Sequence, residues 1–406
     1  FGSSRFGSSH LACLCLKQLM GNNHQVMAAG LQQWLVFWVL HASCNILAAA
    51  RFVCPAIAPA KAEPADVTEL HPGHVSVVMA MGDSITAAFA SRGPLREDLP
   101  LEFRKDSWSI GKGSDDAMTL PYLIRHFNES LAGFASANTV PQTPTTGYLE
   151  YNGDFMDAAL SSARVADLPR ELDHLTVQSS RITDFQHRWK VLTILIGAND
   201  LADSDACSTD PGVRERLTEK FAADLDATLE LTAARFTRLF VNLVPLFSIA
   251  SVRRAIQNHT GILPCTSEAR WLDECDCIDR PQAGSKNVTE SQLSRLDVTT
   301  AFFNKEISRL AVKWNHVRPD FAVVAPGMWA NQPVPNFDFL SKLDCFHPSS
   351  VAHNTMAITL WNSMLQGPRL PAPINATVVP VCPKASSVFY SGPVTRGVVD
   401  ATPVVI

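Results

Sequence analysis

The sequence V-S-V-V-M-A-M-G-D-S-I-T-A-A-F-A, residues 75–90, decides how the rest of the chain is expected to fold. Residues 75–81 form a β-branched, apolar run with the length of a buried strand, and residues 87–90 are compatible with a helix. The intervening Gly-Asp-Ser predicts a strand-to-helix turn with Ser84 at the carboxyl end of the strand, where open parallel sheets bind ligands. The helix would also offer free N–H groups to developing negative charge. Alternatively, the tripeptide is only a turn whose serine caps the helix.

The composition indicates a globular protein. The 406 residues are 46% hydrophobic and 18% charged, which is enough for one large α/β domain or two ordinary ones. The net charge is -5, and the sequence contains no long basic run. A nucleic acid is therefore not expected as a partner.

The N-terminal part of the chain contains a candidate export signal. Residues 31–50 are largely apolar, and a run of small residues follows at 56–60. With a start at Met20 or Met27, this segment would resemble the apolar region of a signal peptide. The alternatives are an uncleaved membrane anchor and a buried core helix. We expect export, with residues 31–50 either cleaved or serving as an anchor.

The cysteines also favour export. Six remain after residue 60, an even number, and their spacing does not match a zinc finger, so disulfides are expected in an oxidising compartment. These cysteines are Cys207, Cys265, Cys275, Cys277, Cys345 and Cys382. Four asparagines open the Asn-x-Ser/Thr pattern of N-glycosylation, which agrees with a secreted protein. They are Asn128, Asn258, Asn287 and Asn375.

Further along the chain, strand-like and helix-like runs alternate. Short apolar runs predict strands over residues 191–196, 239–244 and 321–325. Amphipathic helices are expected where large apolar residues recur every three or four positions, at Leu217, Phe221, Leu225 and Leu229 and again at Leu296, Phe303, Ile307, Leu310 and Trp314. This alternation predicts an α/β fold with a mostly parallel sheet covered on both faces. Two long irregular stretches, residues 92–153 and 245–288, should shape a binding site or lack order.

Polar side chains capable of acyl transfer follow several of these strands. Asp344 and His347 lie three residues apart, so one segment can present a general base and the carboxylate that fixes its tautomer. Asn199 follows the second strand and offers a side-chain N–H at the same edge of the sheet as Ser84. Each has a simpler explanation, since Asn199 can belong to a turn and His347 can precede a helix. Their order in a parallel-sheet protein favours an acyl-transfer site.

Several blocks of sequence resemble the GDSL or SGNH hydrolases, and within them the phospholipase B-like branch. The resemblance covers roughly residues 75–385. The blocks are G-D-S-I-T at Gly82, S-W-S-I-G at Ser107, T-L-P-Y-L-I-R-H-F-N at Thr119, D-L-P at Asp167, G-A-N-D at Gly197, F-V-N-L-V at Phe240, D-C-F-H-P-S at Asp344 and L-W-N-S-M-L at Leu360. The resemblance implies a three-layer α/β/α sandwich of flavodoxin-like type that needs neither metal nor cofactor. It divides the chain into an N-terminal segment (1–60), a hydrolase domain (61–385) and a C-terminal tail (386–406).

The resemblance also implies roles for individual residues. Ser84 would be the nucleophile, His347 the base and Asp344 its partner. The oxyanion hole would consist of the backbone N–H groups of Ser84 and Ser162 and the side chain of Asn199.

The chain departs from the family pattern at three positions: Asp157 stands where asparagine is usual, Ser162 where glycine is usual, and Lys112 interrupts a glycine pair. A positive φ at Ser162 would strain the backbone or misdirect the N–H, whereas a negative φ would let its hydroxyl act as a further donor.

The expected function is that of an exported serine esterase acting on phospholipids or lysophospholipids, a substrate class that allows contact with a membrane surface. Two alternatives stay open. One is an esterase for acetylated carbohydrates or other small esters, because the same site serves both. The other is a lipid-binding protein with weak catalysis.

Overall fold

The computed structural model describes residues 52, 54–55, 57–59, 61–92, 101–149, 153–260, 275–282, 284–368 and 373–392. The chain divides into two units, Phe1–Arg51 and Phe52–Ile406, and all described residues belong to the second. The candidate signal peptide or anchor, residues 31–50, lies outside the described residues. Among the described helices, none combines the length and the apolar character needed to cross a membrane.

A parallel sheet forms the centre of the second unit. Its strands, in spatial order, are β1 (Val75–Gly82), β2 (Trp189–Leu195), β3 (Leu239–Leu243) and β4 (Phe321–Val324). Every neighbouring pair is parallel, and one row of the sheet runs from Met79 through Leu192 and Val241 to Val323. Because nearly every strand residue is buried, both faces of the sheet are covered, as its apolar runs predict.

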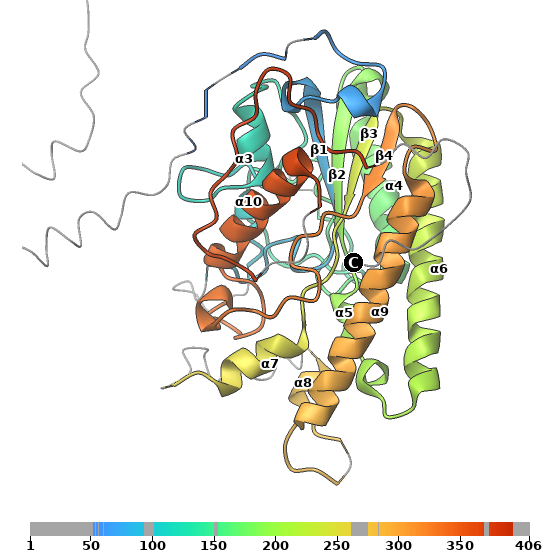
Figure 1. Ribbon diagram of the computed structural model, residues 1–406, viewed down its shortest axis with the longest axis vertical. Coiled ribbons are helices and arrows are strands. Elements are labelled where there is room, and N and C mark those ends of the chain that lie inside the picture. Colours follow the sequence, from blue (N-terminus) through green and yellow to red (C-terminus); the bar gives the residue numbers. More distant parts are fainter. Residues whose placement is uncertain are drawn as a thin grey trace, which may run out of the picture. The chain divides into compact units, whose positions relative to one another are not determined.

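Helices form a layer on each face of the sheet, which gives the expected three-layer α/β/α fold. Helices α4, α6 and α9 cover one face, and α3 and α10 cover the other (Figure 1). The helices are α3 (Leu120–Arg125), α4 (Leu168–Ser179), α5 (Ala198–Leu201), α6 (Pro211–Arg235), α7 (Ala250–Gln257), α8 (Asp276–Asp279), α9 (Glu290–Trp314) and α10 (Ser350–Gln366).

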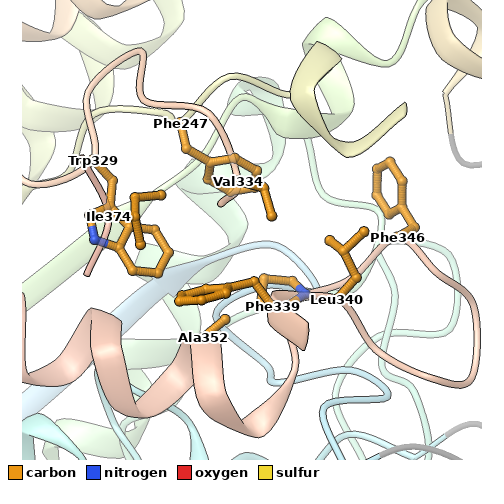
Figure 2. Close-up of a pocket in the computed structure, with 9 residues that line it drawn as sticks. Phe247, Trp329, Val334, Phe339, Leu340, Phe346, Ala352 and Ile374 are labelled. Atoms are coloured by element: carbon orange, nitrogen blue, oxygen red, sulfur yellow. The ribbon is translucent and has the colours of Figure 1, made fainter. Parts of the chain in front are cut away.

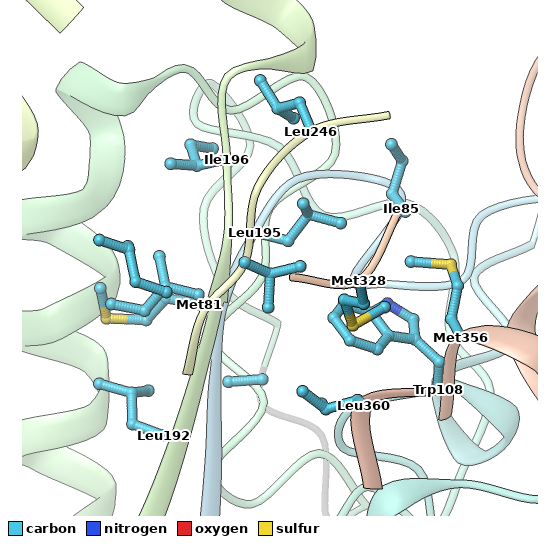
Figure 3. Packing of buried hydrophobic residues seen from close by; sticks show 14 of the residues in the cluster. Met81, Ile85, Trp108, Leu192, Leu195, Ile196, Leu246, Met328, Met356 and Leu360 are labelled. Carbon is cyan, nitrogen blue, oxygen red and sulfur yellow. The ribbon is translucent and has the colours of Figure 1, made fainter. Parts of the chain in front are cut away.

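The hydrophobic core extends over both sides of the sheet (Figure 3). Met81 and Leu192 point toward the layer that contains α6 and α9, whereas Trp108 and Met356 lie on the opposite side. The two predicted amphipathic helices, α6 and α9, pack their apolar sides together. Phe221 and Phe303 stack there with ring centroids 4.1 Å apart.

The helix expected directly after Ser84 is not formed. Residues 84–88 form turns instead, and Ala88 and Ala90 have φ of 56° and 55°. The chain leaves the helical path because Phe89 pairs with Glu102 and the N–H of Ala90 donates to the carbonyl of Leu101. The predicted contribution of a helix N-terminus at Ser84 is therefore wrong. The long stretches 92–153 and 245–288 contain short helices, α3 in the first and α7 and α8 in the second.

Disulfides form, as the cysteine content predicts, but the six cysteines after residue 60 do not pair only among themselves, and one of the six, Cys265, lies outside the described residues. Cys207 pairs with Cys277, whereas Cys382 pairs with Cys54, which precedes the predicted set. Cys345 is also disulfide-bonded, and Cys275 is a buried free thiol. Residue 54 bonds 328 positions away, so spacing alone does not reveal its partner.

The four candidate glycosylation sites differ in accessibility. Asn258, Asn287 and Asn375 are exposed. Asn128 is half-buried, and its Nδ2 atom, to which a glycan would attach, donates to the carbonyl of Val75 at 2.9 Å. Glycosylation stays a prediction for the three exposed positions.

Removing the Cys54–Cys382 disulfide should destabilise the fold, because this bond closes a loop across most of the chain. We expect Cys382→Ser to lower the free energy of unfolding by about 2–4 kcal/mol, measured by thermal or chemical denaturation. Cys275→Ala is the matched control, because Cys275 is a buried free thiol and its loss removes a sulfur atom without opening a disulfide-closed loop. Equal losses in both variants would contradict the assigned pairing.

Candidate active site

Three predicted side chains meet at the carboxyl edge of the sheet. Ser84 follows β1, and the loop before α10 carries Asp344 and His347. The Ser84 Oγ lies 2.8 Å from the His347 Nε2, and the His347 Nδ1 lies 2.7 Å from the Asp344 Oδ2. Ser84 is 8% exposed and His347 only 3%, so the hydrogen bonds between them are largely shielded from water.

Backbone groups hold the carboxylate of Asp344 in place. Its Oδ1 accepts hydrogen bonds from the N–H groups of Phe346 and His347 at 2.9 and 3.0 Å. Burial alone would raise the pKa of Asp344, but the His347 imidazole and these hydrogen bonds bring that pKa below its usual value. The group is therefore a carboxylate at neutral pH, able to accept a hydrogen bond from the Nδ1–H of His347 and so fix that tautomer.

The loop that carries His347 is attached to the turn that carries Ser84. The Ser341 Oγ donates to the carbonyl of Ala90 at 2.7 Å, and the Ser341 N–H donates to the carbonyl of His347 at 2.7 Å. The rings of Phe89 and His347 lie 4.7 Å apart. These contacts fix the imidazole relative to Ser84.

The residues expected to form the oxyanion hole come from the turn after β1, the loop before α4 and helix α5. The N–H of Leu160 donates to the carbonyl of Gly82, which connects the loop of Ser162 to the end of β1. The Asn199 side chain donates to the carbonyl of Ala163 at 2.9 Å, so its amide retains a second hydrogen. Within the described ranges, the N–H groups of Ser84 and Ser162 have no hydrogen-bond acceptor.

The three departures from the family pattern occupy different environments. Ser162 has φ of 69°, the strained alternative of the two considered, and its side chain is exposed. Asp157 is buried and lies 3.1 Å from Arg104. Lys112 exposes its side chain, and its N–H donates to the carbonyl of Ala135 at 2.7 Å.

Three buried acids beside the site were not assigned from the sequence. The Asp83 Oδ1 accepts from the N–H of Ile85, the Glu171 Oε2 accepts from the N–H of Gly82, and the Asp200 Oδ2 accepts from the N–H of Val165. Burial raises the pKa of Asp83 to about 7, that of Asp200 to about 6, and that of Glu171 well above its usual value. Asp83 and Asp200 stand inside the quoted motifs, but Glu171 has no signal in the sequence.

A second buried histidine lies near His347. The Nδ1 of His353, on α10, accepts a hydrogen bond from the N–H of Trp108 at 3.3 Å. Burial and the nearby His347 lower the pKa of His353 to about 3, so this ring stays neutral. It links the S-W-S-I-G segment to α10.

An apolar pocket adjoins His347, since its neighbours in the chain, Phe346 and Pro348, both contribute to the lining (Figure 2). The other lining residues are Phe247, Trp329, Val334, Phe339, Leu340, Ala352 and Ile374. The cavity measures about 10 Å³, which is room for about one water molecule. In the described part of the chain, no cluster of His, Cys, Asp or Glu could hold a metal ion.

Comparisons with known proteins identify similar chains. Residues 78–360 match the family model described as GDSL-like lipase/acylhydrolase. Membrane-associated phospholipase B1 of Mus musculus is 29% identical over 328 residues, which cover 78% of this chain and 20% of that protein. The corresponding protein of Homo sapiens is 28% identical over 329 residues, which cover 78% of this chain and 20% of that protein. This chain therefore spans about a fifth of the length of these relatives.

Two solved structures also align with the chain. The extracellular lipase from Streptomyces rimosus has a TM-score of 0.34 and 12% identity, over 70% of this chain and 98% of the lipase. Phospholipase A1 from Streptomyces albidoflavus has a TM-score of 0.31 and 11% identity, over 70% of this chain and 98% of the phospholipase.

The raised pKa of Asp83 should make stability depend on pH. The folded protein keeps this proton up to about pH 7, whereas the group's ordinary pKa is 3.8, so the unfolded chain releases it earlier. Between these values the folded state binds more protons, and the contribution of Asp83 to stability falls as the pH rises. We expect Asp83→Asn to remove this loss, so that the Tm of the variant rises relative to that of the wild type from about pH 4 to about pH 7 and the difference levels off above that.

The exposed Asp338 offers a control, since Asp338→Asn also removes a carboxylate but not a buried one. A Tm difference between Asp83→Asn and the wild type that stays constant across this pH range would contradict the raised pKa.

Proposed function

The chain belongs to the GDSL-like lipase/acylhydrolase family of carboxylic ester hydrolases, and from this premise we propose that it hydrolyses acyl esters of lipids at Ser84. Phospholipids or lysophospholipids are the proposed substrates. The observation that carries the proposal is the continuous hydrogen-bonded chain from Ser84 through His347 to Asp344. It is the arrangement that activates a serine hydroxyl for attack on an ester carbonyl.

In the proposed reaction, the Ser84 Oγ attacks the ester carbonyl carbon while the His347 Nε2 takes its proton. The Asp344 carboxylate stabilises the imidazolium that forms. The imidazolium then gives its proton to the departing alcohol, leaving an acyl group on Ser84. Water attacks this acyl-enzyme, with His347 again accepting a proton, and the acid is released with Ser84 regenerated.

Negative charge on the carbonyl oxygen would be stabilised by three donors. We assign these to the N–H groups of Ser84 and Ser162 and to the second amide hydrogen of Asn199. Support comes from the two N–H groups, which have no acceptor within the described residues, and from the hydrogen bond that joins Asn199 to the loop of Ser162. Donors held in place before the reaction need no reorganisation as the charge develops.

Two observations support the proposal that the substrate carries a lipid acyl group: the apolar pocket beside His347 and the likeness to proteins named phospholipase B1. The small cavity favours a second candidate, an esterase for short acyl groups. For a long chain to enter, aromatic side chains such as Phe339 and Phe346 would have to move. The disulfides Cys54–Cys382 and Cys207–Cys277 support an exported protein, because such bonds persist in oxidising compartments.

Rates measured on p-nitrophenyl esters of increasing chain length, and on defined phospholipids, separate these functions. A lipid acylhydrolase should prefer long chains, and Ser84→Ala should reduce the rate by at least about a thousandfold, because the nucleophile is lost. Hydrolysis of acetate esters alone would establish the second candidate. Unchanged turnover in Ser84→Ala would refute the assigned nucleophile, and lipid binding without turnover in the wild type would indicate a binding protein.

Ser162→Gly should increase the rate. With φ of 69°, Ser162 occupies a region in which glycine lacks the steric cost of a Cβ. Relief of strain should let the N–H align better, so kcat should rise several-fold, on the order of 1 kcal/mol, with KM nearly unchanged. Asp184→Gly is the matched control, because Asp184 also has a positive φ, 56°, but lies before β2 at the opposite edge of the sheet. An unchanged kcat in Ser162→Gly would show that the N–H of Ser162 is not a donor of the oxyanion hole.

A further inference from the structure

The loop that carries Ser162 is built on a buried ion cluster. The Arg104 Nη2 lies 2.8 Å from the Glu102 Oε2, and the Arg104 Nη1 lies 3.1 Å from the Asp157 Oδ2. The side chains of all three residues are fully buried. Removing charges from water is costly, and a hydrophobic core of the same volume would often be as stable. Such a cluster is therefore weak evidence for stability, and its contacts with the loop indicate a role in geometry.

The guanidinium of Arg104 binds the backbone of the loop directly. Its Nη2 donates to the carbonyl of Ala159 at 2.7 Å, and its Nη1 reaches the carbonyl of Asp157 at 3.5 Å. Its Nε donates to Glu102 at 2.9 Å, so the planar fork is shared between a carboxylate and the loop. A lysine has the charge but not this fixed arrangement of donors.

Glu102 holds the next part of the loop. Its Oε1 accepts from the hydroxyl of Ser161 at 2.5 Å, and the N–H of Ser161 donates to the carbonyl of Gln142 at 2.7 Å. The residue directly before Ser162 is thus tied through both its side chain and its backbone. The other oxygen of the Glu102 carboxylate, Oε2, which pairs with Arg104, also accepts from the hydroxyl of Thr139 at 3.1 Å, and this bond does not involve residues 157–163.

These contacts explain how Ser162 keeps its unusual backbone conformation. A serine with φ of 69° is in a sparsely populated region, and such a conformation persists only when the surrounding structure enforces it. The bonds from Arg104 and Glu102 restrain the residues before Ser162, and the bond from Asn199 to Ala163 restrains the residue after it.

We propose that Arg104 is a positioning residue for ester hydrolysis, which together with Glu102 holds residues 157–163 so that the N–H of Ser162 points at the oxyanion. The proposal rests on the role proposed above for Ser162. Arg104 does not touch the substrate and acts only through the loop. Loosening the cluster should therefore weaken stabilisation of the transition state while leaving substrate binding nearly intact.

Two substitutions around the same carboxylate separate positioning from stability. Ser161→Ala removes the bond between Glu102 and the loop, whereas Thr139→Val removes a buried hydroxyl bond to Glu102 without touching residues 157–163. We expect Ser161→Ala to lower kcat about tenfold with KM within about twofold, a fraction of the cost of losing an oxyanion donor. Thr139→Val should lower Tm by a similar amount as Ser161→Ala but leave kcat unchanged.

Arg104→Lys tests the guanidinium itself and should lower kcat at least as much as Ser161→Ala, again with little change in KM. If it does not fold, the pair at Ser161 and Thr139 still decides the matter. Wild-type kcat in folded Ser161→Ala, or equal kcat losses in Ser161→Ala and Thr139→Val, would overturn the proposal. Ser84→Ala, measured alongside, keeps the two hypotheses apart. If Ser84→Ala is inactive while Ser161→Ala is unaffected, the positioning role alone fails. If Ser84→Ala stays active, the proposed function fails.

Discussion

The close approach of β1 and β2 at Gly82 is the constraint on which the rest of the site depends. Gly82 has φ of 149°, and a Cβ at this position would lie 2.3 Å from the carbonyl oxygen of Leu195, so only glycine fits. Its N–H donates to Glu171 on α4, and its carbonyl accepts from Leu160. One residue thus connects the strand before Ser84, a covering helix and the loop that leads to Ser162.

Acidic groups close to one another around this point have opposite electrostatic behaviour. Asp344 is ionised because His347 and two backbone N–H groups favour its carboxylate, and its pKa is lowered. Burial dominates at Asp83 and Glu171, whose pKa values are raised. Environments that separate the pKa values of neighbouring acids are typical of sites that transfer protons. In this protein the negative charge beside the His347 imidazole therefore lies on Asp344.

The sequence was sufficient to predict the strands and the three layers, because an apolar run is a local signal and parallel strands all end at one edge. Its short motifs also marked Ser84, Asp344 and His347, which meet at that edge. The sequence was insufficient where a distant partner decides the outcome. The run that contains Ala88 and Ala90 is compatible with a helix, but in the fold it bonds to residues 101–102 instead. Likewise, Cys382 bonds to the distant Cys54. Glu171 resembles any acidic residue of an amphipathic helix until the fold buries it beneath Gly82. Burial of charge depends on the packing of several segments, and one segment does not encode it.

Covalent labelling with a fluorophosphonate tests the central claim, a serine activated by its hydrogen-bonded imidazole, most directly. The reagent transfers its phosphorus to a nucleophilic hydroxyl and releases fluoride, and mass spectrometry of the digested protein locates the adduct. The account predicts a single adduct on Ser84 that forms much more slowly in His347→Ala. Labelling of a different residue, or labelling of Ser84 at the same rate without His347, would contradict it.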